Sequence, residues 1–400
     1  MTRLAALLLL GVFACDRAGT PETTGLPTTE SSPPYPEWSL SSAPDVRIGA
    51  VDGPPEYQLT RVAFAGRLSD GRIVMVDDGS SELRWFGPDG DFQSRAGGRG
   101  EGPGEFLRVV SAVVTPQDSV VLYDFRNQRL TWYGPDGALG RILRVELHPF
   151  MRLVPLRDER VVIAEERPTL NLGGAEYNYA QDSVLIMLTG STSQPLDTLM
   201  HRAGREAATW VGYTDGRPTG TRQFGLPFSH PTLVGAASGR IVLLESGRSE
   251  LAFLNEEGEL VRLARRTDVD PPALSAALRQ EYVRNAVESA RERGTPEQLA
   301  QAGAEGLLEV IPEGHRVSPF DRMLTDAVSG RIWVRDYLFE WNAGGTQHWT
   351  VHDALGQVLG RVATPPGLEV IQVGSDFVVG VERDQLGVEY VVAYSLEGSN

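Results

Sequence analysis

Short runs of β-branched and aromatic residues alternate with turns rich in Gly, Asp and Pro along most of the chain. One unit recurs: a β-rich run that ends in an acid, a polar turn, and a second β-rich run that closes on Gly. Its clear copies are 71–77 with 83–90, 118–124 with 130–137, and 239–245 with 251–258. Weaker copies are 160–165, 330–336 with 349–356, and 376–381 with 388–394. The repetition predicts six antiparallel meanders rather than strand–helix–strand units.

Two intervals between copies, from Glu165 to Glu245 and from Glu245 to Asp336, are about twice as long as the others. Each holds an insertion, the first from Thr169 to about Phe224. The second, about 271–314, has a helical pattern with Leu274, Leu278 and Tyr282 on one face. A second helix start follows at Thr295, so the pattern predicts a helical hairpin there.

Six meanders arranged radially form a β-propeller, which protects its strand edges by closing into a ring. A strand-like run at 46–49 precedes the first copy and has no meander of its own, while the chain ends in the strand-like run 390–396. We predict that 46–49 pairs into the last blade. The expected fold is therefore all-β: a six-bladed β-propeller over 38–400, with a helical-hairpin insertion and an N-terminal strand that closes the last blade.

The first residues predict export. Residues 1–14 carry Arg3 and an apolar run too short to span a bilayer, which is typical of a signal peptide. Ala14-Cys15 resembles the end of a bacterial lipobox, so Cys15 is the predicted lipidation site. Phe13 stands where a small residue is preferred, so ordinary cleavage near Ala14 and absence of processing stay open. The remainder of 15–37 is rich in Thr, Ser and Pro and is expected to be a disordered linker. The expected location is the bacterial cell envelope, on its periplasmic side or outer surface, with a membrane bound through the lipid.

Composition removes several function classes. The 37 basic residues are all Arg, against 53 acidic residues, and the net charge is −16. A polyanion would be repelled by the average field, so nucleic acid is not an expected partner. The chain has no lysine, and Cys15 is its single cysteine. Lysine or cysteine catalysis, disulfides and cysteine-ligated metals are thereby excluded for the folded body.

Local motifs carry a resemblance to a known family. The marks are Gly97–Phe106 (GGRGEGPGEF), Gly330–Val334 (GRIWV) and the turns in which Asp precedes a strand. From Val46 to its end the chain resembles the lipid-anchored six-bladed β-propeller proteins of bacteria, relatives of the NHL-repeat propellers. The resemblance implies the fold, export and anchoring. It implies little about chemistry, because most members have no assigned activity.

Two motifs that suggest ligands have structural alternatives. The glycines of 97–104 lack the Gly-Lys-Ser/Thr of a phosphate loop and are interpreted as a blade-linking loop. Asp77, Asp78 and Asp124 could bind calcium, but their repetition favours a role in tight turns. His348 and His352 share a strand face, but alignment places His352 at an outer turn, so no metal site is predicted there.

One constellation suggests binding. Basic residues stand near the start of the predicted innermost strands, and they would ring one mouth of the central channel. They are Arg61, Arg108, Arg152, His230 and Arg322. Arginine grips carboxylate or phosphate in a bidentate way, so the hypothesis is an anionic small ligand or an acidic partner segment. The alternative is that these side chains pair with neighbours such as Glu56, Glu105 and Asp321. No catalytic residue, metal site or cofactor is predicted.

The first functional interpretation is an envelope-anchored propeller that acts as a binding or protein-interaction scaffold. The alternative is a hydrolase or lyase of the lactonase type with a metal in the central channel. The predicted inner strands carry few carboxylates, with Asp326 the clearest case. An envelope sensor or a secretion accessory is a third possibility, so the sequence leaves open whether the protein is an enzyme.

Overall fold

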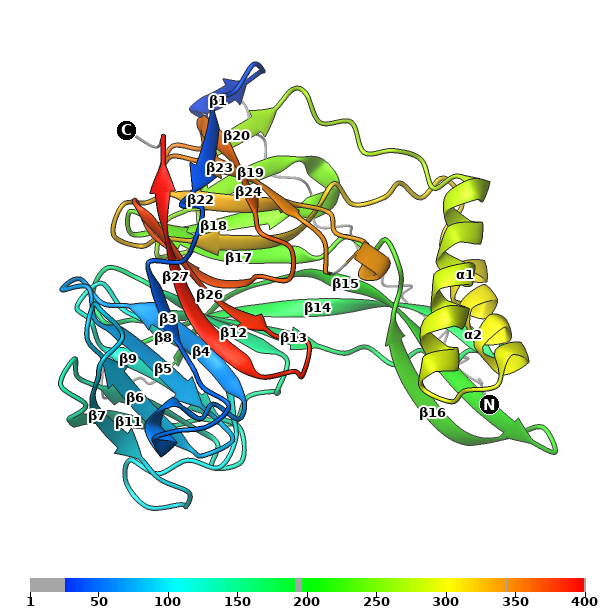
Figure 1. The fold of residues 1–400 in the computed structure, drawn as a ribbon. Coiled ribbons are helices and arrows are strands. Elements are labelled where there is room, and N and C mark those ends of the chain that lie inside the picture. Colours follow the sequence, from blue (N-terminus) through cyan, green and yellow to red (C-terminus); the bar gives the residue numbers. More distant parts are fainter. Residues whose placement is uncertain (1–25, 191–195, 343, 399–400) are drawn as a thin grey trace, which may run out of the picture.

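The computed structural model describes residues 26–190, 196–342 and 344–398, and Cys15 lies outside this range. The described strands form six blades (Figure 1). Blade 1 consists of β4 (Val62–Arg67), β5 (Ile73–Asp77), β6 (Glu82–Phe86) and β7 (Phe92–Gly97). Blade 2 consists of β8 (Val109–Val114), β9 (Val120–Asp124), β10 (Arg129–Tyr133) and β11 (Leu139–Arg144). Blade 3 consists of β12 (Met151–Pro155), β13 (Val161–Arg167), β14 (Tyr177–Thr189), β15 (Leu196–Thr214) and β16 (Arg217–Gly225). Blade 4 consists of β17 (Thr232–Ala237), β18 (Arg240–Glu245), β19 (Glu250–Leu254) and β20 (Leu260–Arg266). Blade 5 consists of β21 (Phe320–Thr325), β22 (Ile332–Asp336), β23 (Gln347–His352) and β24 (Val358–Thr364). Blade 6 consists of β25 (Glu369–Val373), β26 (Phe377–Arg383) and β27 (Glu389–Glu397).

The six innermost strands close a ring. Strands β4, β8, β12, β17, β21 and β25 each pack against the next, and β25 packs against β4. Apolar clusters fill the spaces between neighbouring blades, as where Trp85 of blade 1 packs with Tyr133 of blade 2. The second strands are largely buried because both of their faces meet a neighbouring blade, and in β5 and β9 all five residues are buried. The predicted six-bladed propeller is confirmed.

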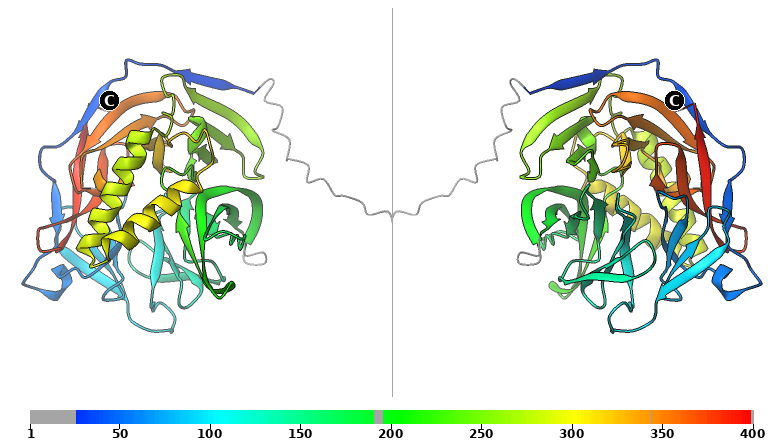
Figure 2. Two further views of the ribbon diagram at one scale, coloured as in Figure 1. Left: turned by 90° about the vertical axis from the view of Figure 1, so that its right-hand side faces the viewer. Right: turned by 90° about the vertical axis from the view of Figure 1, so that its left-hand side faces the viewer.

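The N-terminal segment fastens the ring from outside. Strand β3 (Val46–Ile48) pairs antiparallel with β27 of the last blade, which confirms the predicted closure. Strand β2 (Glu37–Leu40) lies parallel to β24 and antiparallel to β27, and so joins blades 5 and 6. Strand β1 (Thr28–Ser31) runs parallel to β20 of blade 4. Figure 2 shows this segment along the rim.

The expected disordered linker is corrected for residues 26–36. Residues 28–31 form a strand, and the hydroxyl of Ser31 accepts the amide hydrogen of Val358 at 3.1 Å. The composition of this segment offers little apolar surface. The exposed edges of β20 and β24 nevertheless supply backbone partners, which a polar segment can use as well as an apolar one.

The two insertions meet over one face of the ring. The first extends blade 3: β15 pairs with β14 and β16 far beyond the blade. The second is the predicted hairpin, with α1 (Ala276–Glu292) capped by the Ser275 hydroxyl and α2 (Glu297–Glu309) following it. The predicted Thr295 cap is not made, because α2 begins after Pro296 without a side-chain cap. The described residues also form three short 3₁₀ helices: η1 (Pro55–Tyr57), η2 (Ser246–Arg248) and η3 (Glu340–Asn342).

Hydrophobic contacts join the insertions to each other. Ala208 of β15 and Phe228 share a cluster with Leu308 and Ile311 of the hairpin, and the predicted apolar face of α1 packs against it. In Figure 2 the two helices lie in front of the ring. Across the described ranges, no helix is both long enough and apolar enough to cross a membrane.

The acids that end the second strands organise the entry to the innermost strands. The Asp77 carboxylate accepts the backbone amides of Thr60 at 3.3 Å and Arg61 at 3.1 Å. Asp124 accepts the amides of Leu107 and Arg108, both at 3.0 Å, in the same place of the next blade. These bonds support the turn interpretation of the acids, because backbone donors take up the carboxylate oxygens.

The glycine-rich segment 97–104 links blades 1 and 2, as expected. Gly97, Gly98 and Gly104 have φ of 96°, 145° and 77°, which favour glycine. The Arg129 guanidinium donates to the carbonyl oxygens of Glu101, Gly102 and Glu105 and fixes the loop.

Buried His352 predicts a pH-dependent stability. Its Nδ1 bonds to the Gly356 carbonyl at 3.0 Å, and burial lowers its pKa from 6.5 to about 4. Arg266 lowers the pKa further, while the Gly356 bond, Asp353 and Asp268 raise it. As the pH falls, His352 is protonated in the unfolded chain before it is protonated in the folded one. The contribution of neutral His352 to the free energy of unfolding is therefore complete above pH 6.5. It decreases by about 3 kcal/mol as the pH falls towards 4.

Urea unfolding from pH 8 to 4 checks this. We expect His352→Gln to be less stable than the wild type at pH 8 and to lose less stability on acidification. Equal slopes in both proteins would contradict the assignment. His348→Gln serves as the control, because His348 is exposed on the same strand.

Candidate functional site

The mouth of the channel beneath the two insertions is the candidate site. The inner strands begin at the face of the ring over which β14–β16 and the hairpin lie (Figures 1 and 2). This is the mouth at which the sequence places its basic residues. The structure does not bring all five together.

Arg61 and Arg108 belong to a different contact. Both face Asp78, at 2.5 Å for Arg61 and 3.8 Å for Arg108, and Asp78 also accepts the Val109 amide at 2.7 Å. Both guanidinium side chains are half exposed. Arg61 and Arg108 directly precede β4 and β8, and their contacts with Asp78 fasten blade 1 to blade 2; that they bind an anion stays a prediction. The alternative predicted from the sequence, that these arginines pair with neighbouring carboxylates, is confirmed for both. Their partner is Asp78, however, and not Glu56 or Glu105.

His230 contacts a carboxylate and a second imidazole. Its Nδ1 lies 3.3 Å from the Glu206 carboxylate, and its ring lies against His315, with centroids 4.7 Å apart. Glu206 comes from the first insertion and His315 from the loop after the second, so the sequence contains no signal that they meet. His230 belongs to a histidine–carboxylate cluster at the edge of the mouth.

Arg152 of β12 and Arg322 of β21 remain in the channel. Neither forms an ion pair with any described residue, and Nε of Arg322 is buried without a hydrogen-bond partner. The Arg152 side chain is exposed, because it projects into a cavity that other parts of the protein surround. Burial, together with the charges of Arg152 and Arg335, lowers the pKa of Arg322 to about 10. Burial also lowers the pKa of Arg152. Both groups are cations at neutral pH.

The carboxylates near these two arginines have other partners. Asp321 forms a bidentate pair with Arg335, at 2.8 and 3.0 Å. Glu369 bonds to Arg383 at 3.1 Å. Glu166 lies 3.8 Å from Arg205. Carboxylates therefore act on Arg152 and Arg322 only from a distance, without a direct ion pair, so two partly compensated cations lie at the channel mouth of an acidic protein.

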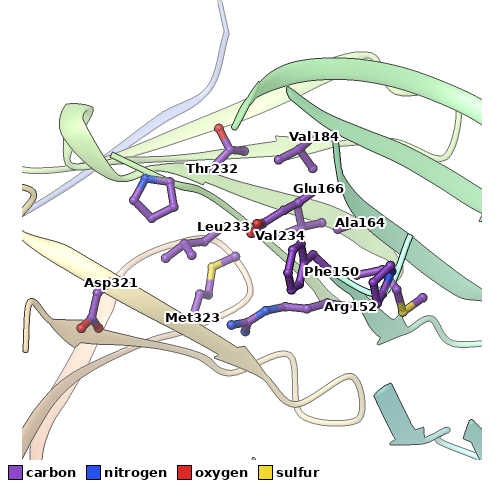
Figure 3. A pocket seen from close by; sticks show the side chains of 13 residues that line it. Phe150, Arg152, Ala164, Glu166, Val184, Thr232, Leu233, Val234, Asp321 and Met323 are labelled. Atoms are coloured by element: carbon purple, nitrogen blue, oxygen red, sulfur yellow. The ribbon is translucent and has the colours of Figure 1, made fainter. Parts of the chain in front are cut away.

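A cavity of about 350 Å³ opens beside Arg152. Figure 3 shows Arg152 reaching into it toward the strand that carries Met323. Glu166 and Thr232 supply polar groups, and Phe150, which is 53% exposed, supplies an apolar wall. Arg322 does not itself line the cavity: its neighbours Asp321 and Met323 on β21 do, and Arg322 lies close enough to Arg152 for the two charges to repel each other. The size suits a small organic molecule.

A second cavity of about 320 Å³ adjoins the first, and the two share Pro231 and Asp321. Its wall is aromatic and combines the hairpin with the loop after β22. The aromatic residues are Phe228, Tyr282, Tyr337, Phe339 and Trp341. Sequence reasoning missed this surface, although the run 337–341 (YLFEW) was a signal: three aromatic residues follow the repeated strand directly.

Among the described residues, no group of three acid or histidine side chains gathers on the innermost strands for the alternative of a metal in the channel. Asp326, its clearest candidate, accepts the backbone amides of Val328 and Ser329, at 2.9 and 3.2 Å, in the turn after β21. Within the described part of the chain, one group of three acid or histidine side chains could hold a cation. That group is Glu206, His230 and His315, which lie outside the innermost strands.

The fold and the mouth define a six-bladed β-propeller with a covered channel entrance. Residues 65–159 match the model of the DUF5128 family, described as a six-bladed β-propeller. No protein of curated function matches the chain in sequence.

Solved structures share this architecture at low sequence identity. A DUF4221 family member from Bacteroides vulgatus has a TM-score of 0.51 at 8% identity, with 91% of this chain and 99% of that one covered. A candidate exported protein from Bacteroides fragilis gives a TM-score of 0.47 at 11% identity, with 92% and 98% covered. A gluconolactonase from Xanthomonas campestris gives 0.40 at 11% identity, with 89% and 99% covered. At 8% identity, the likeness to the DUF4221 family member shows the fold alone and leaves function to the site.

Proposed function

We propose that this protein is a binding propeller whose channel mouth takes an anionic small ligand, held by Arg152 and Arg322. One observation carries the proposal: two cationic side chains of the mouth have no ion-pair partner among the described residues, and each nearby carboxylate is engaged by another arginine. A carboxylate or phosphate between them would compensate both charges and form charge-assisted hydrogen bonds.

The aromatic cavity that adjoins the first one indicates which kind of anionic molecule the site would bind. An anionic group at Arg152 would leave the rest of the molecule next to Pro231, where the two cavities meet. The aromatic wall beyond favours a flat or apolar moiety. We therefore propose an organic acid or phosphate ester with a ring or apolar chain rather than a free inorganic ion.

The N-terminal sequence supports a place in the cell envelope. The signal-peptide pattern of 1–14 and the lipobox-like Ala14-Cys15 favour a lipid anchor, with the propeller held at a membrane surface. Metabolic labelling with a fatty-acid probe, in the wild type and in Cys15→Ser, tests the anchor. Label in the wild type that disappears in Cys15→Ser is expected, and label that persists would contradict it.

Calorimetric titration with a panel of aromatic carboxylates and phosphate esters tests the binding site. The strongest ligand is expected to lose about tenfold or more in affinity in Arg152→Ala and in Arg322→Ala, because each variant removes one charged hydrogen-bonding group. Arg152→Lys keeps the charge but not the bidentate geometry, so its affinity should lie between that of the wild type and that of Arg152→Ala.

Arg108→Ala is the control, since this arginine directly precedes the innermost strand of blade 2 and faces Asp78. It should bind like the wild type. Equal affinity in the wild type, Arg152→Ala and Arg322→Ala, or no binding by any anion of the panel, would overturn the proposal.

A further inference from the structure

Three side chains from distant parts of the sequence meet at the edge of the mouth. Glu206 lies on β15, His230 in the loop before β17, and His315 in the loop that returns from the hairpin to blade 5. Their ligand atoms all lie within 4.8 Å of one another. Each carboxylate oxygen faces a different imidazole: Oε2 lies 3.3 Å from His230 Nδ1, and Oε1 lies 3.8 Å from His315 Nδ1.

The bonds around His315 define which of its nitrogens is free. Its Nε2 lies 2.9 Å from the carbonyl oxygen of Phe228. A carbonyl only accepts, so Nε2 carries a proton and donates it. In the neutral ring Nδ1 then presents a lone pair towards Oε1 of Glu206, and two electron-rich atoms face each other across 3.8 Å. A cation between them would turn this repulsion into attraction.

The carboxylate is held in place by other donors. The backbone amide of His230 donates to Oε2 at 3.2 Å, and the hydroxyl of Tyr179 shares its proton between Glu206 Oε1 at 3.2 Å and Gln181 Oε1 at 3.0 Å. Metal-binding histidines commonly donate their other ring nitrogen to a carbonyl, and metal-binding carboxylates are themselves hydrogen-bonded. Glu206 and His315 both show this arrangement before any ion is considered.

We propose that Glu206, His230 and His315 bind a divalent transition-metal ion of the zinc type. Two imidazole nitrogens and one carboxylate oxygen suit Zn²⁺, whereas Ca²⁺ and Mg²⁺ prefer oxygen ligands alone. The ion would tie the blade 3 extension, the entry to blade 4 and the helical hairpin together.

Three protein ligands leave a coordination position for water or for a further ligand. The residues on either side of His230, Ser229 and Pro231, line the aromatic cavity, as does Arg205 beside Glu206. A bound ion would therefore sit next to the space assigned above to the ligand. The ion site itself depends on none of the arginines that carry the proposed anion binding.

Zinc titration of the full chain, purified without a polyhistidine tag and stripped with a chelator, tests the proposal. We expect about one Zn²⁺ per chain by elemental analysis and a rise in Tm of several degrees when zinc is added. Glu206→Gln, His230→Ala and His315→Ala should each weaken zinc affinity by about 100-fold or more, since each removes a direct ligand.

His201→Ala is the control, because His201 is exposed on the same strand as Glu206. It should retain wild-type affinity, as should Arg152→Ala, which separates this site from the anion site. Cobalt substitution gives a second readout: an intense visible spectrum is expected in the wild type and a weak one in His230→Ala. Should His315→Ala fail to fold, Glu206→Gln keeps the test decisive. Equal zinc affinity in the wild type and in the folded ligand variants would overturn the proposal.

Discussion

Removing residues 1–49 is expected to abolish the cooperative unfolding of the propeller. This deletion takes away β1, β2 and β3 and exposes the edges of three blades. It also removes Ile48, fully buried between blades 6 and 1, and Trp38, which is 8% exposed and packs with blades 5 and 6. Loss of a buried Ile or Trp side chain costs roughly 2–5 kcal/mol each, against a total stability of roughly 5–15 kcal/mol.

Thermal unfolding followed by circular dichroism measures this effect, with deletion of residues 1–25 as the control that keeps every described strand. Ile48→Ala in the full chain should lose roughly 2–5 kcal/mol. Val51→Ala should change little, since Val51 is 55% exposed. A deletion of 1–49 that unfolds at the same temperature as the deletion of 1–25 would show that the clasp does not stabilise the ring.

Asp77→Ala is expected to be the most damaging single substitution of a polar residue that we consider, at roughly 3–5 kcal/mol. The Asp77 side chain is fully buried, accepts the amides of Thr60, Arg61 and Gly79, and lies 3.5 Å from buried Arg84. Alanine would leave these donors unpaired and would remove a counter-charge from a desolvated guanidinium group.

Urea unfolding of Asp77→Ala and Asp77→Asn tests this. Asparagine keeps an acceptor and should lose less stability than alanine. Asp89→Ala is the control: Asp89 is exposed in the Pro-Asp-Gly turn of the same blade, and its removal should cost less than about 0.5 kcal/mol. If Asp77→Ala were as stable as Asp89→Ala, the repeated acid would have no structural role.

The candidate site was predictable only in part. Arg152 and Arg322 followed from their positions near the start of repeated inner strands, because blade alignment places such residues at one mouth. The same alignment grouped Arg61 and Arg108 with them, although these two precede their strands and correspond to Phe150 rather than to Arg152, and both contact Asp78 of the neighbouring turn. Glu206 and His315 lie in the two insertions, which have no repeat to align.

Local patterns determined the blade count, the closing strand and the helical hairpin, since each depends on hydrophobic periodicity and turn residues that act over short distances. The tertiary structure decided which charges find partners and which insertions meet. Contacts such as Phe228 with Leu308, or His230 with Glu206, join segments that are brought together only when the ring closes. Pairing energies at such contacts depend on distance and desolvation in the folded chain, and for that reason no pattern along the sequence encodes them.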